Sequence, residues 1–167
     1  MKLKIIIAAF GLFALEATNI HSLGFGAQFN IGAGDVFAPG AALVLSPSTN
    51  MHLAGNWFVD PINGSTVALT VDRTVFTFPL HTFDIEMIET FNLTVGGGIF
   101  AKVTFGDDAA FNGGFRLPVG LNIFLLRNVL ELYTHLAPSL GLRFIPNFGL
   151  SNPFFPIAIG ARVWLFR

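Results

Sequence analysis

The feature that most restricts the fold of this chain is a long run of alternating residues between positions 111 and 143. From 115 to 125 every second residue is Phe, Leu, Val or Ile, and the residues between them are Arg, Pro, Gly, Asn and Phe. After Arg127 and Asn128 the alternation restarts, with leucines on one side and Glu131, Tyr133 and His135 on the other. A period of two is that of a β-strand. The run therefore predicts two long strands joined by a very short turn.

The length and chemistry of these strands favour a membrane over water. Strands of soluble proteins are usually about 5–6 residues long, with a polar face rich in charged side chains. Here each strand is about a dozen residues long, close to the 9–11 or so that an oblique crossing of a bilayer requires. The face opposite the aliphatic residues carries Gly, Asn, Ser, Tyr and isolated charges. We assign the aliphatic face to lipid and the other face to the interior of a closed barrel.

Composition supports the same assignment. The chain is 53% hydrophobic and 11% charged, whereas soluble domains are about 25% charged. Its mean hydropathy is +0.67, yet no run of about 18 apolar residues could form a membrane helix. A closed barrel satisfies every backbone polar group within lipid, and a very apolar soluble lipocalin-like barrel is the alternative. Cysteine is absent and the net charge is −1, so nothing indicates disulfides, thiolate metal sites or nucleic-acid binding.

Residues 1–21 read as a secretory signal peptide. Lys2 and Lys4 form a basic beginning, and an apolar stretch from Ile5 to Leu15 follows that is too short to span a membrane. We expect this segment to be removed, which leaves residues 22–167 as one transmembrane domain. An export signal with a barrel pattern implies a cell with two membranes and a location in the outer one.

The rest of the chain predicts an all-β, up-and-down antiparallel barrel. Alternation indicates strands at 22–32, 41–46, 51–59, 91–104, 111–127, 130–142 and 157–165. Between 65 and 90 the pattern is ambiguous, because Asp72-Arg73 could form a turn and Pro79 interrupts the run. One strand there gives a total of eight strands, and an extra hairpin gives ten. An even number places both termini in the periplasm, with the short connections at 47–50 and 127–128. The longer connections at 60–64, 106–110 and 145–153 then lie outside the cell.

Three segments in the last third resemble a known family. RLPVGLNIFLL (116–126), LELYTHLAPSLGLRFIP (130–146) and IGARVWLF (159–166) are similar to small spirochaete outer-membrane barrels with an OmpA-like transmembrane domain. The resemblance implies eight strands, periplasmic termini and a C-terminal signal read by the barrel-assembly machinery. That signal is commonly a lipid-facing aromatic residue at the end of the chain. Here Leu165 occupies the lipid-facing phase and Phe166 does not, and the candidate assembly signal consists of Val163, Trp164, Leu165 and Phe166.

The charges predicted to face the barrel interior are the main candidate site. An ion inside a narrow, side-chain-filled barrel is costly unless it is paired. We therefore expect Glu131 to pair with Arg116 or Arg162, in a network that plugs and stiffens the barrel; a gated ion path is the alternative. By parity the interior ions are Lys102, Arg116, Glu131 and Arg162, and the interior polar residues are Gln28, Asn30, Asn122 and Tyr133.

No catalytic, metal or cofactor site is predicted. His135, Ser139 and Glu131 lie on one face, as in a lipid deacylase, but positions four apart in a strand are about 13 Å apart. His52 and His81 lack the spacing of metal ligands.

We therefore predict a monomeric, non-enzymatic anchor or surface-interaction protein. Its expected partners are outer-membrane lipid, the assembly machinery, and host or environmental molecules at the outer loops. The alternative function is a narrow OmpW-like, porin-like channel for small apolar solutes, suggested by the inward residues Phe58, Phe100 and Phe124.

Overall fold

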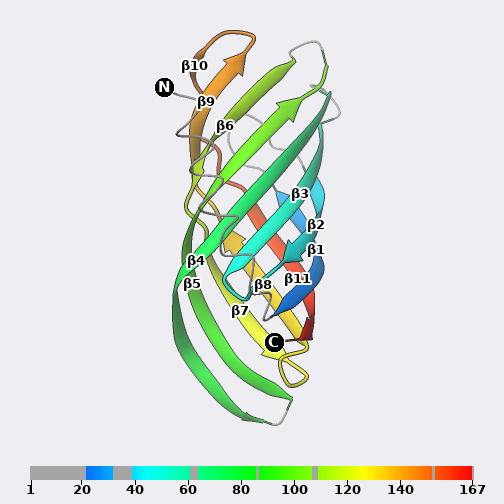
Figure 1. The fold of residues 1–167 in the computed structure, drawn as a ribbon, viewed down its shortest axis with the longest axis vertical. Coiled ribbons are helices and arrows are strands. Elements are labelled where there is room, and N and C mark those ends of the chain that lie inside the picture. Colours follow the sequence, from blue (N-terminus) through cyan, green and yellow to red (C-terminus); the bar gives the residue numbers. More distant parts are fainter. Residues whose placement is uncertain are drawn as a thin grey trace.

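The structure, a computed structural model, is one elongated antiparallel barrel (Figure 1). It describes residues 22–31, 39–60, 64–85, 87–106, 109–151 and 153–166. The proposed signal peptide, at 1–21, lies outside the described residues. Within these ranges no helix is long and apolar enough to cross a bilayer.

Eleven strands form a single sheet that closes on itself through the pairing of the first strand with the last. Their bounds are β1 Leu23–Ile31, β2 Pro39–Ser46, β3 Met51–Asp60, β4 Gly64–Ile85, β5 Ile88–Thr104, β6 Ala110–Arg116, β7 Val119–Leu125, β8 Leu130–Leu136, β9 Ser139–Ile145, β10 Gly149–Leu150 and β11 Ile157–Phe166.

The barrel wall has eight strands, because two of its strands are each interrupted once. β6 and β7 run one after the other along β5, and β8 and β9 run along β7 and β6 in the same way. The short β10 pairs only with β9, at Leu142 and Arg143. The predicted eight-stranded, all-β antiparallel barrel is therefore confirmed.

Proline causes the two interruptions. Pro118 separates β6 from β7 and Pro138 separates β8 from β9, and a proline has no N–H to donate to a neighbouring strand. The breaks lie side by side, and the Leu117 N–H donates to the Pro138 carbonyl while the Gly96 N–H donates to the Pro118 carbonyl. Hydrogen bonds thus continue across the breaks, and the wall stays closed.

The ambiguous region between 65 and 90 forms one long strand, so the ten-strand alternative is wrong. Asp72 and Arg73 lie within β4 and not in a turn, since they pair with His52 and Met51 of β3. Beyond Arg73, β4 has β5 on one side only, apart from the Thr74 N–H bond to the Asn50 carbonyl. Pro79 is tolerated there because an edge strand needs no donor on its free side.

The apolar residues lie on the outside of this barrel and the polar residues on the inside. Phe25 and Phe29 of β1 are exposed, whereas Gln28 and Asn30, at the alternate positions of the same strand, are buried. The other strands repeat the pattern: Leu43 is 79% exposed and Glu131 is 1% exposed. Burial therefore follows the predicted parity, with the aliphatic face outward.

The two ends of the barrel differ. One end, here called the turn end, carries the paired ends of β4 and β5 at Ile85 and Ile88, the pair of Leu23 with Phe166, and the connections 47–50 and 126–129. In the last of these connections Leu126, Arg127 and Asn128 all have positive φ, which permits a tight reversal. The other end, the loop end, carries the longer connections. At the turn end the β4–β5 hairpin projects past β3 (Figure 1), while β7 pairs with β5 as far as Ile88.

Candidate functional site

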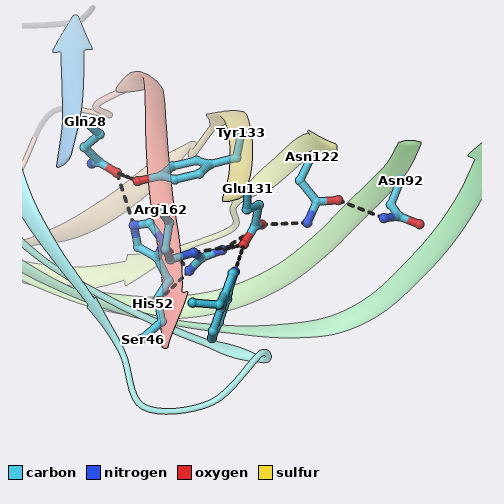
Figure 2. A network of polar contacts seen from close by, with 9 residues as sticks. Gln28, Ser46, His52, Asn92, Asn122, Glu131, Tyr133 and Arg162 are labelled. Atoms are coloured by element: carbon cyan, nitrogen blue, oxygen red, sulfur yellow. Dashed lines mark hydrogen bonds and ion pairs between the residues drawn. The ribbon is translucent and has the colours of Figure 1, made fainter. Parts of the chain in front are cut away.

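The centre of the lumen is organised around Glu131 of β8. Its carboxylate accepts two hydrogen bonds from Arg162 of β11, from Nε at 3.0 Å and Nη2 at 2.8 Å. Trp164 Nε1 donates to the same carboxylate at 2.8 Å, and Asn122 Nδ2 donates at 2.7 Å (Figure 2). Register explains the arrangement, because Glu131 pairs directly with Arg162 on one side and with Phe124 on the other. These four hydrogen bonds fix the position of the buried carboxylate.

The Arg162 guanidinium is itself enclosed. Its Cζ lies 5.1 Å from the centre of the Tyr133 ring and 4.8 Å from the centre of the Trp164 ring, within cation–π range. Its Nη1 donates to Ser46 Oγ and lies 3.3 Å from His52 Nδ1. Since a guanidinium only donates, His52 Nδ1 is the acceptor. Ser46 comes from β2, His52 from β3, Tyr133 from β8 and Trp164 from β11. These strands lie on both sides of the β1–β11 pairing that closes the barrel.

The network continues toward the loop end through amides. His52 Nε2 lies 3.1 Å from Gln28 Oε1, and the Tyr133 hydroxyl donates to the same oxygen at 3.0 Å. Gln28 Nε2 donates to Asn30 Oδ1 at 2.8 Å, and Asn30 Nδ2 donates to Asn56 Oδ1 at 2.9 Å. The interior of β1 to β3 is therefore a chain of neutral donors and acceptors.

A second ion pair joins β4 to β6. Arg116 Nε lies 3.1 Å from Asp72 Oδ1, and both side chains are almost fully buried, although the N–H does not point at the oxygen. Arg116 Nη2 also lies 3.3 Å from His135 Nε2. Between the two charged residues is Gly98, where an added Cβ would lie 2.0 Å from Asp72 Oδ1. The glycine leaves the space through which this carboxylate reaches Arg116.

Aromatic residues occupy the lumen toward the loop end. Phe58 and Ala68 form a small apolar cluster with Phe154, whose ring centre lies 6.1 Å from that of Phe58. Lys102 Nζ lies 5.1 Å from the centre of the Phe154 ring. At this end of the lumen, apolar side chains thus lie beside buried polar ones such as Thr66 and Asn112.

The structure places the predicted interior ions in three different settings. Glu131 contacts Arg162, Arg116 contacts Asp72, and Lys102 lies over Phe154. The predicted polar residues Gln28, Asn30, Asn122 and Tyr133 all face the lumen and join the network.

The residues weighed as a catalytic triad have other partners. The Ser139 hydroxyl donates to the Ala137 carbonyl at 2.7 Å, Glu131 is bound by Arg162, and His135 contacts Arg116. Among the described residues no group of three or more His, Asp or Glu side chains could hold a metal ion.

Several members of the network were not named as site residues from the sequence. Asp72 was a candidate turn residue, His52 was set aside because it lacks the spacing of metal ligands, and Ser46, Asn56 and Asn92 were not singled out; in the structure Asn92 Nδ2 donates to Asn122 Oδ1 at 3.1 Å. Parity contained the signal for two of them, since Asp72 is in phase with the inward Thr70 and His52 with the inward Ala54.

Within the described part of the chain, two of the cavities lie between these groups. The larger, of about 270 Å³, lies at the turn end and is lined by residues that include His52, Asp72, Asn92, Tyr133 and Arg162. The smaller, of about 20 Å³, lies nearer the loop end and is lined by residues that include Arg116, Phe58 and Phe100. Asp72 borders one cavity and Arg116 the other, so this ion pair lies between them.

Comparison with known proteins adds a fold likeness. No family model and no curated protein matches the chain. One solved structure that is similar is described as the N-terminal beta-barrel domain of Pseudomonas aeruginosa OprF. The match covers 87% of this chain and 98% of that domain, at 10% sequence identity and a TM-score of 0.49. Identity and score at this level assign no family and no function.

Proposed function

We propose that this protein is an integral outer-membrane β-barrel, held in lipid by its apolar outer surface. The observation that carries the proposal is the inversion of the usual burial pattern. Phe25, Leu43, Leu69, Phe115 and Ile159, on five different strands, are all about half exposed or more. Amide and charged side chains are buried in their place. In water this arrangement would expose a continuous apolar belt. In a bilayer the apolar outer surface contacts lipid, and the polar side chains face the interior of the barrel.

The two ends support an orientation. Short turns and both ends of the described chain lie at one end, which in barrels of this kind faces the periplasm. Phe148 and Phe155, which are exposed and lie between β9 and β11 in the chain, then face the outside of the cell. Export through a signal peptide at 1–21 and insertion by the assembly machinery, which would read Val163 to Phe166, belong to the same proposal. Trp164 of that segment also has a structural role, because its indole N–H binds Glu131.

The proposed role is that of a non-enzymatic anchor whose outer loops contact molecules outside the cell. The lumen supports this role over transport. It contains the Arg116–Asp72 pair between its two cavities and the contact between Phe58 and Phe154 at the loop end. We expect no discrete current steps when the purified barrel is inserted in a planar bilayer. Reproducible steps would favour the alternative, a channel for small apolar solutes.

Replacing a single outward residue tests the membrane assignment. Leu43 is central in β2 and 79% exposed, with the buried Ala42 and Val44 on either side of it. On a lipid-facing surface Leu43→Arg should cost about 2–4 kcal/mol near the midplane of the bilayer. On a water-exposed surface the same change should cost less than about 0.5 kcal/mol. Urea unfolding of the barrel refolded in lipid vesicles measures the difference, and a cost in the second range would overturn the proposal.

A further inference from the structure

The larger cavity has a wall made of β4 and β5, in which β5 is also paired with β7 but β4 has no second neighbour. β3 begins at Met51, which pairs with Arg73, so β4 continues for twelve residues, 74–85, with no third strand beside it. β5 follows β4 along this length, and together they project past the turn at 47–50 (Figure 1). The larger cavity is lined both by this turn and by the projecting hairpin.

The two faces of the projecting hairpin differ in chemistry. Its outer face carries Phe76 and Phe78, whose rings stack with their centres 6.1 Å apart. Its inner face is rich in threonine and asparagine, and β4 Thr77 pairs with β5 Thr94. Five residues of the hairpin contribute hydroxyl or amide groups to the cavity lining: Thr74, Thr77, Thr90, Asn92 and Thr94.

The ions that border the cavity are already neutralised. Glu131 and Arg162 form a pair with two hydrogen bonds, and the Asp72 carboxylate lies against Arg116. The lining therefore offers many neutral donors and acceptors together with ions that are each compensated within the protein. A charged molecule entering this site would lose hydration without gaining a counter-ion, and that loss is costly.

We propose that the turn-end cavity is a binding site for a small, neutral, hydroxyl-rich molecule of about one sugar ring. Binding pockets usually measure about 300–1,000 Å³, and a cavity of about 270 Å³ is at the lower limit of that range. Hydroxyl and amide groups of the hairpin supply hydrogen bonds, and the side chains of Tyr133 and Phe124 supply apolar contact. The compartment that the cavity faces depends on the orientation proposed above, but binding by the purified barrel does not.

Titration of the refolded, detergent-solubilised barrel with N-acetylglucosamine tests this site, with isothermal calorimetry as the readout. Glucosamine and glucuronate are matched probes, because each has a similar ring and carries a charge at neutral pH. We expect saturable binding of the neutral sugar and at least tenfold weaker binding of both charged ones. Equal binding of all three probes, or no saturable binding of the neutral sugar, would overturn the proposal.

Two pairs of valine substitutions locate the site. Thr77→Val with Thr90→Val removes two hydroxyls from the cavity wall at nearly constant side-chain shape, and we expect at least fivefold weaker binding. Thr66→Val with Thr104→Val is the control, because these two hydroxyls contact each other at 3.1 Å and do not line the cavity. The control should bind as the parent does. Equal affinity of the cavity variant and the control would contradict the assignment. A difference in gel mobility between heated and unheated samples checks independently that the barrel of each variant is folded.

Discussion

The ion pair between Glu131 and Arg162 gives the sharpest test of how the lumen stabilises this barrel. Glu131→Gln keeps the size of the side chain but removes its charge, leaving the Arg162 guanidinium buried without its counter-ion. Arg162 is 6% exposed, so we expect little water to replace the lost partner. Breaking a buried pair in this way costs about 3–5 kcal/mol. The glutamine oxygen can still accept one of the bonds from Arg162 or Trp164, so we expect about 3 kcal/mol, more than a hundredfold in the folding equilibrium.

Urea unfolding in lipid vesicles measures this free energy, with the folded fraction read from the mobility of unheated samples on a gel. Trp164 fluorescence is unsuitable as the readout, because the indole N–H is hydrogen-bonded to Glu131 and the substitution itself would change the emission. A loss below about 1 kcal/mol would refute the reasoning, since it would mean that the guanidinium finds hydration in the cavity beside it.

A double-mutant cycle identifies the partner of Glu131. The effects of Glu131→Gln and Arg162→Gln should be strongly non-additive, by about 1–3 kcal/mol, because each single change leaves the other group unpaired. The control cycle combines Glu131→Gln with Arg116→Gln. Arg116 has its own partner in Asp72, so these two effects should add to within about 0.5 kcal/mol. A larger coupling to Arg116 than to Arg162 would contradict the pairing described here.

Two further predictions concern packing and orientation. Gly160→Ala should destabilise the barrel by about 1–3 kcal/mol, because the added Cβ would lie 2.5 Å from the Tyr133 ring. Gly55→Ala is the control and should be neutral or slightly stabilising, because no atom lies within 4 Å of the added Cβ. Equal effects of the two substitutions in urea unfolding would contradict this prediction. The chain has no cysteine, so Phe148→Cys and Ser48→Cys are each unique labelling sites. On intact cells a membrane-impermeant maleimide should label position 148 and leave position 48 unlabelled, and the reverse result would invert the orientation.

The sequence by itself determined the class of fold and the direction of each side chain. Strand alternation has a period of two, so one correct assignment, such as Phe115 outward, fixes Arg116 and every later position in that strand. The inward positions of Gln28, Glu131 and Arg162 followed from this local geometry. It also explains why Asp72 was missed, since a pair of charged residues resembled a turn and the lack of a second neighbour for β4 was not visible locally.

Only the tertiary structure decided which interior groups meet. Parity allowed Glu131 to pair with either Arg116 or Arg162. The stagger, which is the offset in register between neighbouring strands, places Arg162 directly opposite Glu131. The same stagger brought Asp72 to Arg116 across Gly98. It also left β4 without a second neighbour beyond Arg73, at the wall of the larger cavity. Stagger depends on hydrogen bonds between segments far apart in the chain, and the alternation within one strand carries no information about it.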